Sequence, residues 1–203
     1  MKAKLVEAAV ASLVERGYAA TTAVEVSKRA GVTRGAFNHH YASLANLFAD
    51  VLDELYDKFA AGRDEESASL ESMLDAGLAV YAHPEFKAVL ELWLACRNDK
   101  ALGETLFTKV AACATRFEPE SYPHLAAKFD AHPQAAGVYW LIFETMIGLS
   151  LARATSSVGQ TPAHEKLVSE QLITMARQQD AVMSAQEQND AVSSKPRSVS
   201  NRR

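Results

Sequence analysis

The chain has 203 residues, of which 48% are hydrophobic and 23% are charged, and its formal net charge is −4, a composition typical of a globular protein that can bury a sizeable core. Its two cysteines, Cys96 and Cys113, lie inside apolar helical patterns and form no CxxC pair, which argues against a disulfide framework or a zinc site. No positively charged leader precedes an apolar stretch, and the most apolar segment, 138–151, contains Glu144 and is too short to span a bilayer, so we expect a cytoplasmic protein with no membrane partner.

The charges are unevenly distributed along the chain. Residues 1–47 carry six Lys or Arg against three Glu, a net charge of +3, whereas the rest of the chain carries −7. A basic N-terminal segment on an acidic body is typical of a protein that contacts phosphate at one end only. The excess is small, and chance unevenness explains it equally well.

Helix-forming residues dominate the sequence and alternating strand patterns are absent, which predicts an all-α protein of about nine helices. The first predicted helix, 2–16, has an apolar stripe and ends at Gly17, which can adopt the left-handed conformation. Thr22 and Glu25 match a capping box, in which each side chain bonds the other's free amide, and predict a helix over about 23–30. Thr33 and Ser43 are the next N-cap candidates, opening helices that extend to about His40 and to near Gly62.

The second half of the chain has fewer sharp boundaries. Helices are predicted near 67–82, 85–97, 101–117, 134–156 and 163–182. The segment 118–132 is predicted to be a loop that can hold one short helix around 125–129. The last twenty or so residues lack a hydrophobic pattern and are predicted to be disordered.

Two of the predicted short helices, joined by Ala30-Gly31-Val32, have the dimensions of a DNA-binding helix-turn-helix. Gly31 suits the sharp turn, and Val26 and Val32 can pack inside the angle between the helices. At 100° per residue, Phe37 faces inward and the opposite side presents Arg34, Gly35, Asn38 and His39. Arginine can pair with guanine and asparagine with adenine in the major groove. Any short exposed helix can carry such residues, so this geometry alone leaves the assignment open.

Longer stretches of sequence favour one family. LVEAAVASLVERGY, then TT, VSKRAGVTRGAFNHHY and LF at 47–48 fall at family spacing, and residues 5–55 resemble the DNA-binding domain of the TetR (tetracycline-repressor-like) family. The run LELWLACRND, from Leu90 to Asp99, resembles the middle helix and turn of that family, and Gly148-Leu149 resembles its dimerisation segment. The resemblance implies a three-helix DNA-binding domain over 1–46 and a helical ligand-binding and dimerisation domain over 47–182, and the missing hydrophobic pattern predicts a disordered tail over 183–203.

The resemblance also implies which residues contact operator DNA. Thr22 caps the second helix and can donate to phosphate, and the third helix contacts bases or backbone. The positions carried over are Thr22, Thr33, Arg34, Gly35, Ala36, Asn38, His39 and His40.

Two positions depart from the family pattern. The family usually has tyrosine at the position of Asn38 and lysine at the position of Leu44, and both of those side chains typically reach a phosphate. Losing such contacts weakens binding almost independently of DNA sequence. A ligand-binding protein of this type with weakened or lost DNA binding is therefore the alternative to a functional regulator.

The resemblance implies a homodimer in which the last two helices form a four-helix bundle with those of the partner. The same apolar stripes would suit the core of a monomer, but a single helix-turn-helix usually needs a second half-site for specific binding. The expected interface residues are Leu141, Thr145, Gly148, Leu149, Ala152, Leu172 and Ile173.

A pocket between helices of the second domain is the expected site of an unidentified, largely apolar effector. The expected lining residues, each of which would also suit a plain core, are Met73, Phe86, Leu90, Trp93, Phe107, Val110, Phe117, Trp140 and Phe143, with Arg97 and Glu144 as polar groups that orient the ligand.

We therefore predict a repressor whose effector shifts the dimer toward a form with wrongly spaced recognition helices. An enzyme is the rival from another class of function. Six histidines are scattered along the chain, without an HExxH motif, a nucleophile elbow or a phosphate-binding glycine loop. We accordingly expect no catalytic activity, no metal ion and no cofactor.

Overall fold

The computed structural model describes residues 1–61, 69–115, 123–156 and 163–193, and the regular elements in these ranges are all helices. They are α1 (Lys2–Arg16), α2 (Ala23–Arg29), α3 (Arg34–His40), α4 (Leu44–Ala60), α5 (Leu70–Ala82), α6 (Phe86–Asn98), α7 (Lys100–Thr115), α8 (Pro123–Ala131), α9 (Pro133–Thr155) and α10 (Glu165–Ser193). The predicted all-α fold is confirmed, with ten helices in the described ranges rather than about nine.

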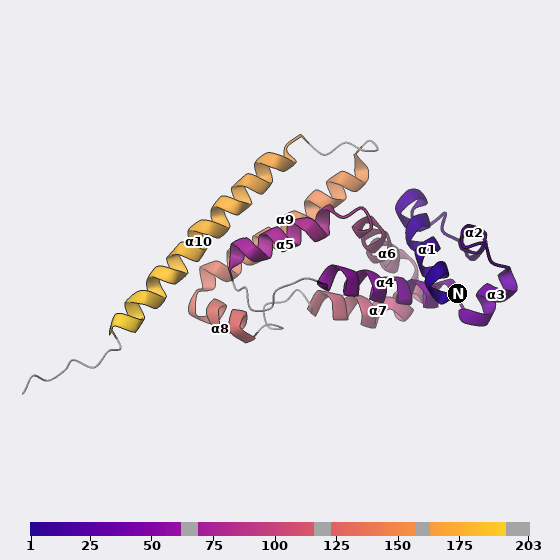
Figure 1. The fold of residues 1–203 in the computed structure, drawn as a ribbon, viewed down its shortest axis with the longest axis horizontal. Helices are drawn as coiled ribbons and strands as arrows, with labels where there is room; N and C mark the ends of the chain where they lie inside the picture. Colours follow the sequence, from indigo (N-terminus) through magenta and orange to yellow (C-terminus); the bar gives the residue numbers. More distant parts are fainter. Residues whose placement is uncertain (62–68, 116–122, 157–162, 194–203) are drawn as a thin grey trace, which may run out of the picture.

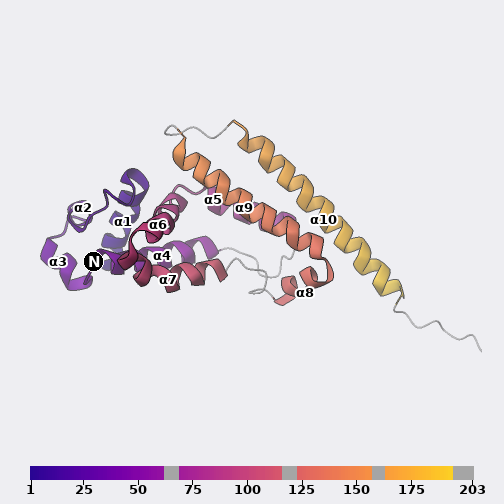
Figure 2. The same cartoon turned by 180° about the vertical axis from the view of Figure 1, so that it is seen from behind.

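The molecule is elongated, with α1, α2 and α3 at one end (Figure 1). Helix α4 packs against α1 and also against α7, so it connects this end to the rest of the chain. Helices α5, α9 and α10 pack on one another at the opposite end, and α9 and α10 run side by side along one side of the molecule (Figure 2). One continuous cluster of buried apolar side chains extends from α1 to α10.

Most helix starts lie where their capping residues predict them. The hydroxyl oxygens of Thr22, Thr33 and Ser43 accept hydrogen bonds from backbone amides three residues ahead, at 3.2, 3.1 and 3.2 Å. Gly17 and Gly31 have φ angles of +74° and +66°, which confirms that both positions need a conformation that other residues rarely adopt.

The C-terminal part corrects two predictions. Helix α10 continues to Ser193, so residues 183–193 are helical and not part of a disordered tail; 194–203 lie outside the described residues. Contacts distant in sequence support the extension, because Met183 is buried and Glu187 lies 3.8 Å from Lys128 of α8. Just before it, Asp180 accepts from the Leu70 and Glu71 amides at 2.9 and 3.0 Å. In addition, α8 occupies nine residues of the segment predicted to be mainly loop.

Helix α9 is longer than its most apolar segment suggested. It spans 23 residues, and within the described chain it is the one helix long and apolar enough to cross a membrane by length and composition. Only a third of its most apolar stretch is buried. This helix packs against α5, α6, α8 and α10, so it is a core helix of the protomer that keeps one apolar face uncovered.

A buried ion pair joins three of the helices at this end. The Arg153 guanidinium donates to Glu165 of α10, with Nε to Oε2 at 2.7 Å, and to the Tyr81 carbonyl of α5 at 3.0 Å. The hydrogen bond from Arg153 holds the pKa of Glu165 below its usual value of 4.5. Glu165 is therefore ionised when folded, and its charge is paired.

Two glycines of the helical body differ in what surrounds them. A Cβ on Gly103 would lie 2.8 Å from the Cys96 carbonyl oxygen, because α6 and α7 approach closely there. Gly103→Ala should therefore lower the free energy of unfolding by about 1–3 kcal/mol. Gly137 of α9 has no atom within 4 Å of such a Cβ, so Gly137→Ala should be neutral or stabilising by up to about 1 kcal/mol. Urea unfolding at one protein concentration checks this, and equal stabilities would contradict the described α6–α7 approach.

Candidate nucleic-acid interface

Helix α3 is anchored to the domain by one aromatic side chain. Phe37 is 2% exposed, and its ring lies 5.9 Å from that of Tyr41. Val26 of α2 is fully buried and Val32 of the turn packs against the same core, as predicted. With Phe37 fixed inward, the opposite side of α3 must face solvent.

The structure places four of the expected DNA-contacting residues on that outer side. Arg34, Gly35, Asn38 and His39 are exposed, whereas Ala36 and His40 are half-buried. Thr22 and Thr33 are exposed as well. Because each threonine hydroxyl already accepts from a backbone amide, its own proton is free to be donated to a phosphate oxygen.

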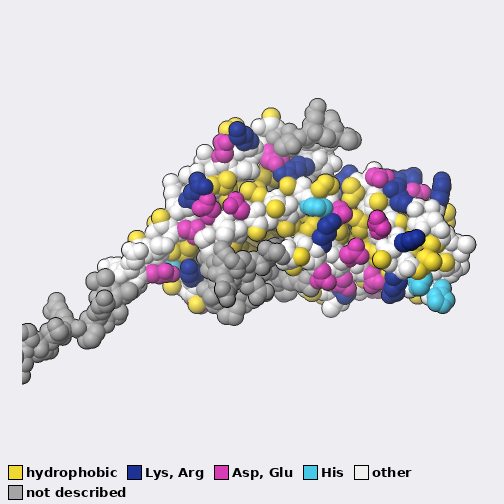
Figure 3. All heavy atoms as spheres, viewed as in Figure 1, with side chains coloured by type: hydrophobic (Ala, Val, Ile, Leu, Met, Phe, Trp, Pro, Cys, Tyr) yellow, Lys and Arg dark blue, Asp and Glu magenta, His cyan; other side chains and the backbone are white. Residues whose placement is uncertain are grey.

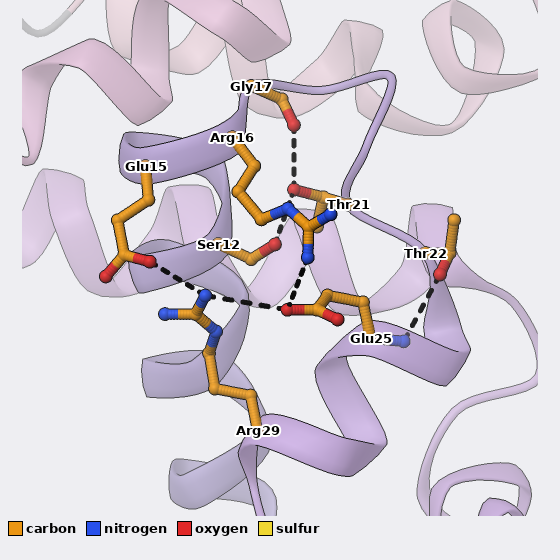
Figure 4. A network of polar contacts seen from close by, with 8 residues as sticks. All are labelled: Ser12, Glu15, Arg16, Gly17, Thr21, Thr22, Glu25 and Arg29. Atoms are coloured by element: carbon orange, nitrogen blue, oxygen red, sulfur yellow. Dashed lines mark hydrogen bonds and ion pairs between the residues drawn. The ribbon is translucent and has the colours of Figure 1, made fainter.

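Glu25 does only half of what the capping-box pattern predicts. Its backbone amide donates to Thr22, but its carboxylate pairs with Arg16 at 3.0 Å and Arg29 at 3.5 Å instead of capping the Thr22 amide. Arg29 also pairs with Glu15 at 2.8 Å, so a chain of four charges joins α1 to α2 (Figure 4). The hydrogen bond from Arg16 lowers the pKa of Glu25, which is therefore ionised at neutral pH.

A buried pair of hydroxyls lies beside these charges. Thr21, 2% exposed, donates to the Gly17 carbonyl at 2.8 Å, and its oxygen lies 2.9 Å from the hydroxyl of the fully buried Ser12 (Figure 4). Since the Thr21 proton is used, Ser12 supplies the proton of the second bond. This pair fixes the α1–α2 loop against α1.

Helix α6, which is distant in sequence, holds the same loop. The Tyr18 amide donates to the Glu91 carboxylate at 2.8 Å, and the Tyr18 hydroxyl donates to Asp99 at 2.7 Å. Burial and the Asp99 hydrogen bond raise the pKa of Tyr18 to about 12. The hydroxyl therefore keeps its proton at neutral pH. Because both bonds join α6 to the loop that leads into α2, a displacement of α6 would also displace this loop.

Basic side chains gather at the end formed by α1–α3 (Figure 3), but many of them are already paired. Arg16 and Arg29 are engaged with glutamates, and Lys2 lies 3.5 Å from Asp50. Lys4, Lys28 and Arg34 make no ion pair within the described residues and are the cations left for phosphates or bases. Leu44 is half-buried and packs against the core, so it supplies no such group.

The residues expected to line an effector pocket fall into three groups. Phe86 and Leu90 are buried, and Met73, Trp93, Val110 and Phe143 are half-buried. Arg97, Phe107, Trp140 and Glu144 are exposed, Phe107 by 74%, so the described chain does not enclose them. Phe117 lies outside the described residues.

One aromatic side chain that we did not predict connects the buried members. Tyr81 of α5 has its ring 4.6 Å from Phe86 and 6.1 Å from Phe143. The Trp93 indole lies 6.0 Å beyond Phe86 and donates to the Tyr56 hydroxyl at 2.9 Å. The helical spacing of Leu70, Leu74, Gly77 and Tyr81, all buried, is the signal that would have found it.

The expected dimer residues divide between surface and core. Leu141 and Gly148 are exposed, and Thr145, Ala152 and Ile173 are half-buried. Leu149 and Leu172 are 6% and 4% exposed in a single chain, so they are core residues of the protomer and have little surface left for a partner.

Comparisons with known proteins agree with this architecture. Residues 5–51 match the family described as "Bacterial regulatory proteins, tetR family". The HTH-type transcriptional regulator CymR of Pseudomonas putida is 28% identical over 155 residues, which cover 73% of this chain and 76% of CymR. A transcriptional regulator of Rhodococcus sp. Rha1 superposes with a TM-score of 0.64 at 23% identity, over 87% of this chain and 96% of that one. The multidrug binding protein EbrR, solved with imidazole, superposes with a TM-score of 0.55 at 19% identity, over 86% and 94%.

The buried hydroxyl pair predicts a specific mutational pattern. Thr21→Val keeps the shape of the side chain but leaves Ser12 and the Gly17 carbonyl without this partner, so unfolding should cost about 1–3 kcal/mol less. Adding Ser12→Ala to Thr21→Val should recover part of the loss, because both groups of the pair are then apolar. Urea unfolding followed by circular dichroism measures both variants. Equal stability of Thr21→Val and the wild type would show that this pair contributes nothing.

Proposed function

Because this chain belongs to the TetR family of helix-turn-helix transcriptional regulators, we propose that it is a ligand-responsive repressor that binds a palindromic operator as a homodimer. The observation that carries the proposal is the outer side of α3, where Arg34, Gly35, Asn38 and His39 are exposed opposite a buried Phe37. The family consists of regulators rather than enzymes, in agreement with the missing catalytic motifs. Its DNA target implies that the protein works in the cytoplasm.

We assign recognition of the operator's base sequence to Arg34 and Asn38. They lie one turn apart on α3, so both can point into one major groove. Arginine pairs bidentately with guanine and asparagine with adenine, each pair discriminating by about 1–3 kcal/mol. Gly35 lies between them and has no side chain to hold the helix away from the bases.

We assign the contacts with the phosphate backbone of DNA to Lys4, Lys28 and the hydroxyls of Thr22 and Thr33. The two lysines are exposed and make no ion pair within the described residues. The family usually has a lysine at the position of Leu44. Lys4 and Lys28 supply positive charge in its place, at other positions. The chain thus retains the means to hold phosphates, which favours a working regulator over a protein that has lost DNA binding.

The uncovered face of α9 supports the homodimer. Leu141 is 46% exposed, and Thr145, Gly148 and Ala152 continue the face at helical spacing. The small residues among them permit close contact between helices. Covering this apolar face with a second copy removes it from water and gives two recognition helices one DNA turn apart.

The effector is proposed to act on the helical body. EbrR, whose fold is similar, is a multidrug binding protein, and this likeness supports a small-molecule site in the present chain. Helix α6 is the route by which such binding reaches DNA, since Glu91 and Asp99 hold Tyr18 directly. A ligand that prefers a shifted α6 would displace the loop before α2 and lower operator affinity.

The DNA assignment predicts two kinds of loss. Arg34→Ala and Asn38→Ala should each weaken operator binding by the dimer about 25- to 20,000-fold, since about 5–150-fold is lost at each of the two half-sites, and should relax the preference for one base pair in each half-site. Lys28→Ala should weaken binding equally on all sequences and make the slope of log K against log salt less negative by about 1.8 for a dimer, at about 0.9 per contact. Fluorescence anisotropy on the DNA upstream of the protein's own gene measures both, with Lys128→Ala of α8 as the control. A folded dimer that binds no DNA even at low salt would favour the alternative, a ligand-binding protein without operator recognition.

The dimer assignment predicts a change in assembly. Leu141→Arg should convert the protein to a monomer and abolish operator binding, because a charge would be buried in the interface. Leu94→Arg is the matched control, since Leu94 is 55% exposed on α6, away from this face. Sedimentation velocity gives the masses. Unchanged sedimentation of Leu141→Arg would place the interface elsewhere.

A further inference from the structure

A groove of about 250 Å³ lies between the C-terminal end of α4 and the second half of α5, beside the aromatic cluster around Tyr81, because its lining residue Phe59 has its ring 6.0 Å from that of Phe86. Apolar side chains crowd this part of the surface in Figure 3. The groove is lined by Lys58, Phe59, Ala61, Ala76, Ala79, Val80 and His83.

The walls of the groove are apolar and packed. Phe59 and Val80 are 7% and 8% exposed, and the His83 ring lies edge-on to Phe59 at 5.7 Å. Three alanines leave the hollow between them. A cavity of about 150 Å³ is enough for benzene, so this space suits a single ring or a short alkyl chain.

The rim offers hydrogen-bond donors and a positive charge. The Glu85 amide donates to His83 Nδ1 at 3.3 Å, so that nitrogen is an acceptor and the imidazole proton lies on Nε2, which can donate. The Lys58 ammonium uses one of its three protons on the Glu85 carboxylate, at 2.5 Å. Glu85 keeps its second carboxylate oxygen and its negative charge on this rim, so a ligand carboxylate must compete with Glu85 for the Lys58 ammonium, which has two protons left.

We propose that this groove binds a small organic carboxylate, with its ring or alkyl chain against Phe59 and Val80 and its carboxylate on Lys58 and His83. The inference rests on the proposed ligand-responsive function and names the chemical class of the effector. An apolar hollow with a cation and a second donor at its edge is complementary to this class, because the hollow takes the apolar part of the ligand and the two donors take its carboxylate.

Binding there would alter a link between helices. Lys58 belongs to α4 and Glu85 is the N-cap residue of α6, so their ion pair ties the two helices that both pack against α1. An incoming carboxylate competes with Glu85 for the Lys58 ammonium. Once Glu85 is released, α6 can shift relative to α4, and α6 carries the carboxylates that hold Tyr18.

Calorimetric titration of the full chain, without DNA, tests the proposal. Benzoate, phenylacetate and hexanoate are each compared with the corresponding amide. At least one carboxylate should bind ten or more times more tightly than its amide. Lys58→Met should reduce that preference to threefold or less, while Lys87→Met, a lysine of α6 that does not line the groove, should retain it. Three carboxylates that bind no better than their amides would overturn the inference.

A second variant, which should strengthen carboxylate binding, separates the proposed effect from damage to the fold. Glu85→Gln removes the competing charge, so it should tighten carboxylate binding severalfold, whereas damage to the fold would weaken it. Weaker binding in both Glu85→Gln and Lys58→Met would contradict competition at this rim. Operator binding is measured separately. If the protein binds carboxylates through Lys58 but binds no operator, only the repressor proposal is contradicted. If it binds the operator but shows no preference for carboxylates, only the groove proposal is contradicted.

Discussion

The burial of Phe37 sets the direction of every other side chain on α3. Its ring contacts Tyr41, whose hydroxyl donates to Asp50 of α4 at 2.8 Å, so the recognition helix is tied to the helix that enters the body. Truncating a buried phenylalanine to alanine lowers the free energy of unfolding by about 3–5 kcal/mol. This is a large share of the about 5–15 kcal/mol by which a typical domain is stable. The outward position of Arg34 and Asn38 is therefore a consequence of core packing and needs no interaction of their own.

The sequence predicted those parts of the fold that are specified locally. The caps at Thr22, Thr33 and Ser43 were predictable because an N-cap bond joins residues only three apart. The inward and outward sides of α3 followed from the helical period alone. The extension of α10 beyond 182 was not predictable in this way, since it is supported by the burial of Met183 and by the pairing of Glu187 with Lys128 of α8.

In the candidate sites, too, the features that depend on contacts between distant residues could not be predicted from the sequence. The basic residues in 1–47 could be counted, but not which of them would be neutralised, because the partners of Arg16 and Arg29 come from two different helices. Glu25 matched a capping pattern and pairs with those arginines instead. The predicted pocket was composed of large apolar residues, whereas three of the seven residues that line the groove of α4 and α5 are alanines. Alanine carries no sequence signal for a cavity, since it is equally common in any helix.

The contact between Asp180 and the start of α5 bears on the order in which the chain folds. Two amides in the first turn of α5 receive their acceptor from a residue synthesised about 110 positions later. Helices α1 to α4 pack on one another within the first sixty residues and can form as soon as they leave the ribosome. The helices from α5 to α10, whose closing contacts have high sequence separation, must wait for nearly the whole chain, so the packing of α1 to α4 can precede the part proposed to control it.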